Sequence, residues 1–403
     1  MAKSKILVGL EIGTSKTCMV VGEIRPDATA TILGAGLVHS AGVRRGEIVD
    51  QAMARQCVQD AWQNAQINAN VDILNVFLSI TGDHIRGENH TGSYRLPDDE
   101  DIIDEEHMHY AREKAERLDL ANGRFVINTE TGGYSIDGGE PTLLPSGLSG
   151  RTLDVNSHII HGVVDRVKNS LLCVRSIPLE VEEMVFAPLA TAQMVLTRQQ
   201  KETGALLIDI GGGTTDYICY INGEVVASGC VPYGGRAINS DIINSLNQSV
   251  SKEAAEYLKC VEGDAFGDVN DRSLAQFRSD LGLHEVNVER GVLNRIIRNR
   301  LASILLRVRD DIPPELLRRD GMCLFLSGGS SMMRGLDGLA YHIFRVPVMQ
   351  PEQVGPGETH YARDPRYCTA VGLIRYAQRF DDDALAAENT SLLTKFLNIF
   401  RNR

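Results

Sequence analysis

The chain has 403 residues, of which 43% are apolar and 23% are charged, a composition that is ordinary for a soluble globular protein. This length exceeds one typical hydrophobic core and fits two to four compact units. The formal net charge of −12 argues against a nucleic-acid partner, because a phosphate backbone would be repelled. No signal-peptide pattern opens the chain and no apolar run reaches the roughly 18 to 20 residues of a spanning helix, so we expect a cytosolic protein.

The first stretch, residues 6–21, predicts two strands joined by a small polar turn. An apolar run is followed by Glu11 and then by the turn residues Gly13, Thr14, Ser15 and Lys16. Backbone N–H groups in such a turn are accessible to a phosphate. An ordinary tight hairpin gives the same pattern, so this stretch alone leaves both interpretations open.

The remainder of the first 81 residues continues with a third strand near 31–37, a helix with apolar spacing over 48–65 and a strand over 71–80. The order strand, strand, strand, helix, strand is the opening of a ribonuclease-H-like fold. We therefore predict that residues 1–81 begin such a fold.

The segment 82–161 differs in character, because polar turns surround one charged helix predicted over 105–120. We expect a small inserted α/β unit. It contains no cluster of catalytic residue types, so we interpret it as an exposed interaction module. The chain then returns to the main fold through a helix over 164–173, a strand near 176–183 and a helix over 183–197.

A second copy of the opening pattern occupies residues 206–221. Its apolar runs flank the turn Gly211, Gly212, Gly213 and Thr214. Glycines at this position can adopt positive φ and leave the backbone N–H groups exposed to a phosphate. The flanking Asp209 and Asp216 could hold a hydrated Mg²⁺ beside that phosphate, and Glu11 occupies the corresponding place in the first copy. Two copies predict a duplicated domain pair that faces one nucleotide.

Further glycine turns follow in the second half. Gly234 and Gly235 precede a predicted helix start, an arrangement suited to backbone contact with phosphate. Glu256 and Lys259 lie three residues apart on one helical face, where a solvated ion pair is the simple alternative to a binding role. A long helix is predicted over 289–311, and a strand near 324–327 leads into the turn residues Gly328, Gly329 and Ser330.

The C-terminal residues predict a linker and an amphipathic helix. Residues 381–391 are acidic, small and polar, which is typical of a linker. In residues 392–403 an apolar arc of about 160° lies opposite basic and polar residues. The helix is too short to span a bilayer, so we expect it to lie in the interface of an anionic membrane, with packing against the protein core as the alternative. The predicted membrane-contacting residues are Leu392, Leu393, Lys395, Phe396, Leu397, Ile399, Phe400 and Arg401.

The three glycine turns resemble the actin, Hsp70 and sugar-kinase superfamily, and the full order of motifs with the inserted unit and the terminal helix resembles the FtsA family of bacterial cell-division proteins. The resemblance implies an actin-like duplicated ribonuclease-H-like α/β fold with an inserted α/β subdomain in the first half. It implies subdomain 1A over 1–81, 162–200 and 361–380, inserted subdomain 1C over 82–161, subdomain 2A over 201–237 and 301–360, subdomain 2B over 238–300, the linker 381–391 and the terminal helix 392–403.

The resemblance also implies ATP and Mg²⁺ as ligands between the two halves. The turns at 13–16, 211–214 and 234–235 would hold the phosphates. The ribose and adenine would contact Glu256, Lys259, Gly328, Gly329 and Ser330, and Mg²⁺ would be held, through water, by Glu11, Asp209 and Asp216.

The implied function is a scaffold that assembles into actin-like filaments on the inner face of the cytoplasmic membrane at the division site. There it would anchor FtsZ filaments and recruit later division proteins through residues 82–161. Leu189 stands where actin carries the glutamine that orients water, so we expect slow ATP hydrolysis at most and no catalytic residue. The alternatives are a cytosolic sugar kinase or polyphosphatase of the same fold, or an FtsA-like adaptor of pilus assembly.

Overall fold

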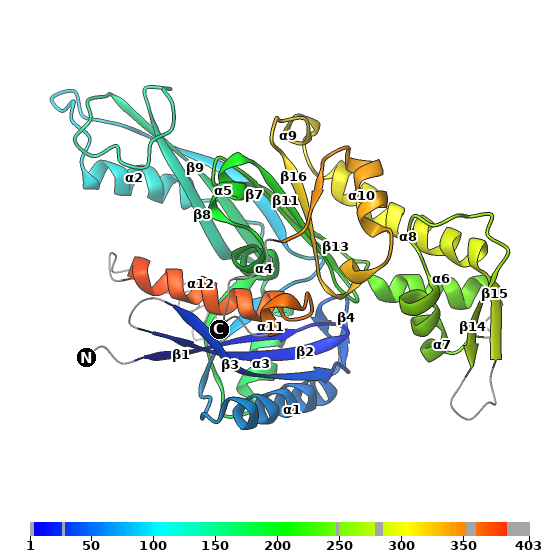
Figure 1. Ribbon diagram of the computed structural model, residues 1–403. Coiled ribbons are helices and arrows are strands. Elements are labelled where there is room, and N and C mark those ends of the chain that lie inside the picture. The colour runs from blue at the N-terminus through cyan, green and yellow to red at the C-terminus, as the bar shows by residue number, and fades with distance from the viewer. Residues whose placement is uncertain (1–3, 26–28, 247–249, 279–284, 352–359, 385–403) are drawn as a thin grey trace.

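The structure is a computed structural model that describes residues 4–25, 29–246, 250–278, 285–351 and 360–384 (Figure 1). Among these residues, no helix combines the length and the apolar character needed to cross a membrane. The predicted terminal helix, 392–403, lies outside the described residues.

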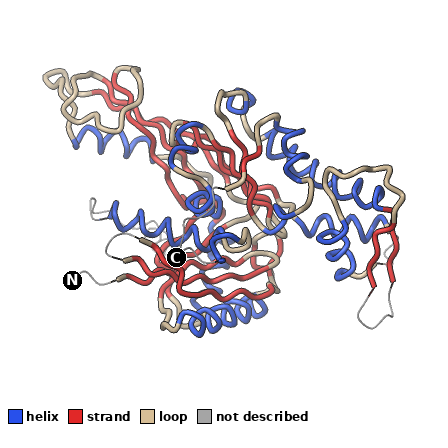
Figure 2. Tube along the Cα trace, in the orientation of Figure 1, coloured by secondary structure: helices blue, strands red, loops and turns tan. Residues whose placement is uncertain are grey.

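The first lobe contains a five-stranded sheet with the strand order β10-β6-β1-β2-β3. The strands of both lobes are drawn in red in Figure 2. β1, β2 and β3 are antiparallel, whereas β6 pairs in parallel with β1 and with β10. Helix α1 packs on β3, where a Cβ on Gly36 would meet the Ala61 carbonyl oxygen at 1.9 Å. The elements are β1 (Lys5–Ile12), β2 (Lys16–Ile24), β3 (Ala30–His39), β4 (Val43–Arg44), β5 (Glu47–Ile48), α1 (Gln51–Ala69), β6 (Asn75–Ile80), α3 (Val164–Arg175) and β10 (Glu180–Phe186).

The second lobe repeats this topology in a sheet with the order β13-β12-β11-β16-β17. Its first three strands are antiparallel, and β16 and β17 add in parallel. The same sequence of pairings in both lobes confirms the duplicated fold. The elements are α5 (Arg198–Thr203), β11 (Ala205–Ile210), β12 (Thr215–Ile221), β13 (Glu224–Val231), α9 (Pro314–Leu317), β16 (Cys323–Ser327), η2 (Gly329–Met332), α10 (Leu336–Phe344) and β17 (Val348–Met349).

The side chains of β11 alternate between two hydrophobic cores, as the two-residue period of a strand requires. Leu206 and Ile208 belong to the core of the second lobe, whereas Ala205 and Leu207 belong to the cluster that extends from the first lobe. This strand is therefore buried on both faces, and it ends at the acidic residue Asp209 and Ile210.

An outer part of the second lobe carries a small hairpin at its far end (Figure 1). Its helix α8 begins after β15 and packs against both α6 and α10. The elements of this part are α6 (Gly235–Ser245), α7 (Lys252–Tyr257), the π-helix η1 (Leu258–Glu262), β14 (Leu274–Arg278), β15 (Glu285–Glu289) and α8 (Arg290–Asp310).

The inserted subdomain forms a separate three-stranded antiparallel sheet with one helix, which confirms the predicted insertion. It has a small hydrophobic core of its own, to which Ala111, Leu153 and Val155 contribute. Asp104 caps the helix, because its carboxylate accepts the His107 N–H at 2.9 Å. The elements are β7 (Arg86–Arg95), α2 (Glu105–Glu116), β8 (Arg124–Ile136) and β9 (Thr152–Val163).

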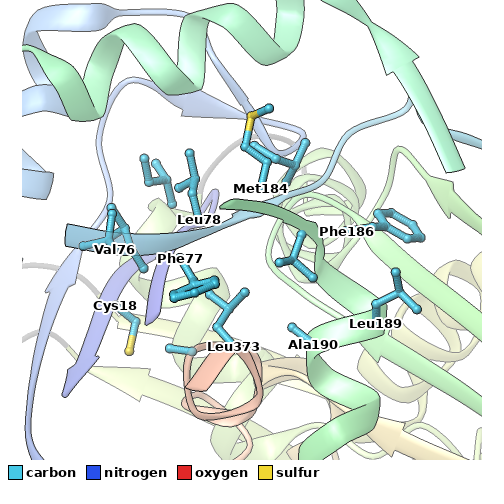
Figure 3. Packing of buried hydrophobic residues seen from close by; sticks show 14 of the residues in the cluster. Cys18, Val76, Phe77, Leu78, Met184, Phe186, Leu189, Ala190 and Leu373 are labelled. Atoms are coloured by element: carbon cyan, nitrogen blue, oxygen red, sulfur yellow. The ribbon is translucent and has the colours of Figure 1, made fainter. Parts of the chain in front are cut away.

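Two further helices, α4 (Ala187–Val195) and α12 (Cys368–Ala384), cross closely beside the first sheet. A Cβ on Gly372 would meet the Ala190 carbonyl oxygen at 2.0 Å, so only glycine permits this crossing. Figure 3 shows Phe186, Leu189 and Leu373 in the hydrophobic cluster that these helices share with the sheet. The short α11 (His360–Arg363) precedes α12.

Several element ends differ from the sequence-based expectation; the helix expected over 105–120, for example, ends at Glu116. The strand expected to stop near residue 183 continues to Phe186, and the helix begins only at Ala187 with Pro188 in its first turn, where proline is favoured. Helix α12 continues to Ala384, four residues into the predicted linker. Residues 385–391 of that linker lie outside the described residues.

Candidate functional site

The two predicted glycine turns have the same hydrogen bond. In the first glycine turn, residues 13–16, the Gly13 N–H donates to the Lys16 carbonyl at 2.9 Å. In the second glycine turn, residues 211–214, the Gly211 N–H donates to the Thr214 carbonyl at 2.9 Å. Both turns close an antiparallel pair at the equivalent edge of their sheets, as the repeated sequence pattern predicts.

The turns contact each other across the two lobes. A Cβ built on Gly212 would meet the Ser15 Oγ at 1.9 Å, and one on Gly213 would meet the Thr14 Oγ1 at 2.3 Å. Glycine is therefore needed at these positions because the two turns approach each other too closely for a side chain. Their freedom to adopt positive φ is not used in this turn, since none of the residues 211–213 is among the positive-φ residues of the described chain.

Gly234 and Gly235 lie directly against the second glycine turn. The Gly235 N–H donates to the Gly211 carbonyl at 2.9 Å, and the Arg236 N–H donates to the Gly212 carbonyl at 2.8 Å. These two N–H groups thus hold the N-terminus of α6 on the turn. A Cβ on Gly234 would meet the Gly211 carbonyl oxygen at 2.4 Å, so this contact also requires glycine.

The residues predicted for the ribose and adenine gather beside this contact. The Lys259 Nζ lies 2.7 Å from the Glu256 carboxylate, and this lysine is only 6% exposed. A Cβ on Gly235 would meet the Ser330 Oγ at 2.6 Å and the Lys259 Nζ at 3.4 Å. The third glycine turn, residues 328–330, therefore lies next to Gly235 and Lys259. Its Gly328 has a positive φ of 80°.

Glu11 and Lys16 form a half-buried ion pair in the first lobe. Burial works against the charged form of Lys16, but the neighbouring negative groups, chiefly the Glu11 carboxylate, together outweigh burial and raise the pKa of Lys16. Lys16 is therefore positively charged and directed toward carboxylates, where a phosphate would have to compete for it.

The two aspartates of the second lobe are held in an environment that opposes their ionisation. Burial raises the pKa of Asp209 to about 7, and the negative charges of Glu11 and Asp216 add to this shift. Burial likewise raises the pKa of Asp216 to about 6. A bound cation would relieve this cost, so the site fits a metal ion electrostatically.

The geometry favours a metal ion held through water. Among the described residues, no group of three or more histidine, cysteine, aspartate or glutamate side chains lies close enough to hold an ion directly. Glu11, Asp209 and Asp216 still share one electrostatic environment, since the charge of Glu11 acts on both aspartates. Carboxylates around a hydrated cation are a common arrangement for Mg²⁺.

Several polar residues of this site were missed by sequence analysis. The Thr81 hydroxyl donates to the Asp216 carboxylate at 2.6 Å, and the Thr191 hydroxyl lies 3.2 Å from the Asp209 carboxylate. The Asn239 amide donates to the Glu256 carboxylate at 2.5 Å. The two threonines come from the first lobe, far away in sequence, whereas the position of Asn239 one helical turn after Gly235 was a usable signal.

The buried Asn239 Oδ1 has no hydrogen-bond partner among the described residues. An acceptor in this state favours a ligand that carries a donor, such as a sugar hydroxyl. Together with the glycine turns and the carboxylates, this atom makes the arrangement suitable for a nucleotide with a hydrated metal ion.

The inserted subdomain contacts the second lobe through polar groups on β13. The two ring nitrogens of His158 lie 2.6 Å from the Asn89 Oδ1 and 2.7 Å from the Ser228 Oγ. The Asn89 amide donates to the Val226 carbonyl at 2.8 Å, and the Gly133 N–H donates to the Glu224 carboxylate at 2.6 Å. Burial lowers the pKa of His158 to about 4, so this histidine is neutral.

Comparison with protein families identifies two matches in the chain. The family described as cell division protein FtsA matches residues 206–372, and the family described as the SHS2 domain inserted in FtsA matches residues 82–161. The cell division protein FtsA of Escherichia coli strain K12 is 32% identical over 386 residues, which cover 93% of this chain and 90% of that protein. The cell division protein FtsA of Neisseria meningitidis serogroup B is 32% identical and covers 94% of this chain and 92% of that protein.

Solved structures share the fold at low sequence identity. A chain of a PilM–PilN type IV pilus biogenesis complex has a TM-score of 0.62 and 17% identity, over 92% of this chain and 98% of that chain. MreB5 of Spiroplasma citri bound to AMPPNP has a TM-score of 0.51 and 16% identity, over 96% of this chain and 99% of that chain. These likenesses confirm the actin-like fold.

Proposed function

Because this chain belongs to the FtsA family of cell-division proteins, we propose that it is a nucleotide-dependent division scaffold that anchors FtsZ filaments to the inner face of the bacterial cytoplasmic membrane. The observation that carries this proposal is the 32% identity to a cell division protein FtsA over 93% of the chain. We also propose that the chain assembles into filaments, in keeping with its actin-like fold.

The nucleotide in this proposal is ATP with Mg²⁺. Two features support it: the glycine turns of both lobes meet, and the nearby carboxylates have raised pKa values that a cation would offset. The bound metal ion would supply positive charge against the phosphates. Residues 13–16 and 211–214 would hold the phosphates, Glu256, Lys259, Asn239 and the third glycine turn would hold the nucleoside, and Glu11, Asp209 and Asp216 would hold the hydrated ion.

We propose slow hydrolysis at most, so that the nucleotide controls assembly. Leu189 lies fully buried in the core, on the helix α4 that also carries Thr191 beside Asp209. An apolar side chain cannot orient an attacking water, and Thr191 is already within hydrogen-bond distance of the Ala187 carbonyl and Thr369. A role as a sugar kinase or polyphosphatase finds no support in the cell-division relatives, and the pilus likeness concerns the fold alone.

The membrane contact in this proposal belongs to residues 392–403, and the inserted subdomain is the proposed contact for later division proteins. The support for the membrane contact is the sequence pattern, in which Phe396 lies at the centre of the apolar arc and Asn398 lies opposite it. Because the chain has a net charge of −12, anionic lipid repels it as a whole. The basic residues of the helix must therefore supply the attraction to the lipid.

Co-sedimentation with anionic vesicles, with and without Mg-ATP, tests the scaffold proposal. We expect the full chain to pellet with the vesicles and a chain that ends at Ser391 to stay in solution. Phe396→Glu should abolish binding, whereas Asn398→Glu, which adds the same charge on the opposite face, should weaken it less. Equal binding of the full and the shortened chain would contradict the tail anchor, and FtsZ filaments should pellet with vesicles only when the full chain is present.

A further inference from the structure

The hairpin of β4 and β5 lies over both glycine turns. Its two-residue loop is Arg45-Gly46, between the paired residues Arg44 and Glu47. The Gly46 N–H donates to the Thr14 Oγ1 at 2.9 Å, and a Cβ on Gly46 would meet the Thr214 Cγ2 at 3.3 Å. This loop therefore contacts the first glycine turn in one lobe and the second glycine turn in the other.

Arg45 has a backbone conformation that arginine rarely adopts. Its φ is 52° and the φ of Gly46 is 77°, which matches the type I′ turn of a two-residue hairpin loop. The first position of that turn favours asparagine, aspartate or glycine. Positive φ in a residue other than glycine is uncommon and concentrates at functional sites. The choice of arginine at this position therefore calls for a reason beyond the turn itself.

Three arginine side chains from both lobes gather around the ring of Tyr233. The guanidinium carbons of Arg45, Arg300 and Arg307 lie 5.6, 5.6 and 4.8 Å from the ring centroid. Arg300 is paired with Asp241 at 2.6 and 2.8 Å. For Arg45 and Arg307 the described part of the chain offers no carboxylate within ion-pair distance.

This cluster is a local excess of positive charge in a chain whose net charge is −12. Unpaired guanidinium groups that converge on one ring favour the approach of an anion between them. The position of the cluster indicates which anion: Tyr233 directly precedes the Gly234-Gly235 turn, and Arg45 directly precedes the glycine that is bonded to Thr14.

We propose that Arg45 contacts the terminal phosphate of a bound nucleoside triphosphate and thereby makes the contact between the two lobes depend on that phosphate. The planar guanidinium suits this role because it can donate two parallel hydrogen bonds to phosphate oxygens. A nucleoside diphosphate lacks the group that Arg45 would contact, so the residue would distinguish the two nucleotides. This inference rests on the proposed nucleotide binding.

Arg45→Asn tests the proposal without removing the turn, because asparagine is favoured at this position of a type I′ loop. Arg44→Asn is the matched control, since Arg44 is the adjacent exposed arginine and loses the same charge. Titration calorimetry of the full chain with Mg²⁺ would measure affinity for AMPPNP, a triphosphate analogue, and for ADP. We expect Arg45→Asn to weaken AMPPNP binding about tenfold or more and ADP binding less than about twofold.

The control variant should change neither affinity by more than about twofold. Equal losses for both nucleotides, or no loss for either, in Arg45→Asn would overturn the role of Arg45. If the wild-type chain bound neither nucleotide, the proposed nucleotide function itself would fail, which is a separate outcome. Hydrogen exchange of residues 43–48 gives a second readout: we expect slower exchange with AMPPNP than with ADP in the wild type, and equal exchange rates there would also contradict the proposal.

Discussion

Asp209 and Asp216 are buried carboxyl groups whose ionisation lowers the stability of the folded protein. Each is a carboxyl group whose charged form is opposed by burial and by neighbouring negative charge. Thr81 and Thr214 donate hydrogen bonds to Asp216, but these bonds compensate burial only in part. A bound cation would offset the cost of ionising these two aspartates. Without a cation, this cost reduces the free energy of unfolding.

Asp216→Asn should stabilise the nucleotide-free protein at pH 7. The folded-state pKa of Asp216 is about 6 and the unfolded value is 3.8, so ionisation costs stability that grows as the pH rises between these values. We expect a gain on the order of 1 to 3 kcal/mol in the free energy of unfolding at pH 7, and a smaller gain at pH 5.

Urea unfolding at the two pH values measures this effect. The exposed Asp98→Asn should change the free energy of unfolding by less than about 0.5 kcal/mol and serves as the control. A loss of stability in Asp216→Asn at pH 7 would show that the carboxylate is already compensated in the nucleotide-free state.

At the scale of elements, strand β13 joins the hairpin of β11 and β12 to the inserted subdomain. It pairs with β12, where Cys230 is opposite Asp216, and its outer side contacts the inserted subdomain through Ser228 and His158. The same strand therefore lies between the Asp216 carboxylate and the proposed interaction module, so a structural change at either site can reach the other through one rigid element.

The contact between β13 and β9 should weaken on acidification. Burial places the folded-state pKa of His158 at about 4, below the ordinary value of 6.5, so its contribution to stability is complete above pH 6.5 and is lost as the pH falls toward 4. His158→Gln keeps a hydrogen-bond donor and an acceptor but does not titrate. We expect the loss of unfolding free energy between pH 7 and pH 5 to be smaller by about 2 kcal/mol in this variant.

Denaturant unfolding at both pH values, with His109→Gln as the control, measures this difference. His109 is exposed in the same subdomain and should leave the pH dependence unchanged. An identical pH dependence in His158→Gln and the wild type would mean that the buried histidine does not govern the contact.

At the scale of the whole molecule, the two lobes meet at their glycine turns and through helix α4, which crosses α12 of the first lobe and also contacts β11 and β12 of the second. Gly212 and Ser15 make the contact at the turns, and Gly372 and Ala190 make it at the crossing. Both contacts are too close for a larger side chain. A ligand that binds both lobes would therefore stabilise the whole molecule.

Mg-ATP should raise the melting temperature, and removal of Mg²⁺ should abolish most of this increase. At a nucleotide concentration a hundredfold above the dissociation constant, binding adds about 2.7 kcal/mol to the free energy of unfolding. With EDTA present, the carboxylates Glu11, Asp209 and Asp216 would repel the phosphates. Thermal melts with ATP, with and without EDTA, measure this effect, and equal shifts in both conditions would show that the carboxylates hold no metal ion.

The sequence by itself determined the order of the first strands and helix in the first lobe, the positions of the two hairpins and the presence of the insertion. These features are local, because alternating apolar residues define a strand and glycine defines a turn over a few positions. The resemblance of the motif order to a family then led to the fold. Element ends were less certain, as the late start of α4 at Ala187 shows, since a helix and a buried strand share apolar residues.

Only the tertiary structure decided which residues meet. Thr81 bonds to Asp216 across 135 positions of sequence, and no local pattern encodes such a pair. The same holds for Arg45 and Tyr233, which come from different lobes. The tertiary structure also explains why the second turn needs glycines, because the opposite turn approaches too closely for a side chain. This reason lies in the contact between the lobes and is absent from the turn itself.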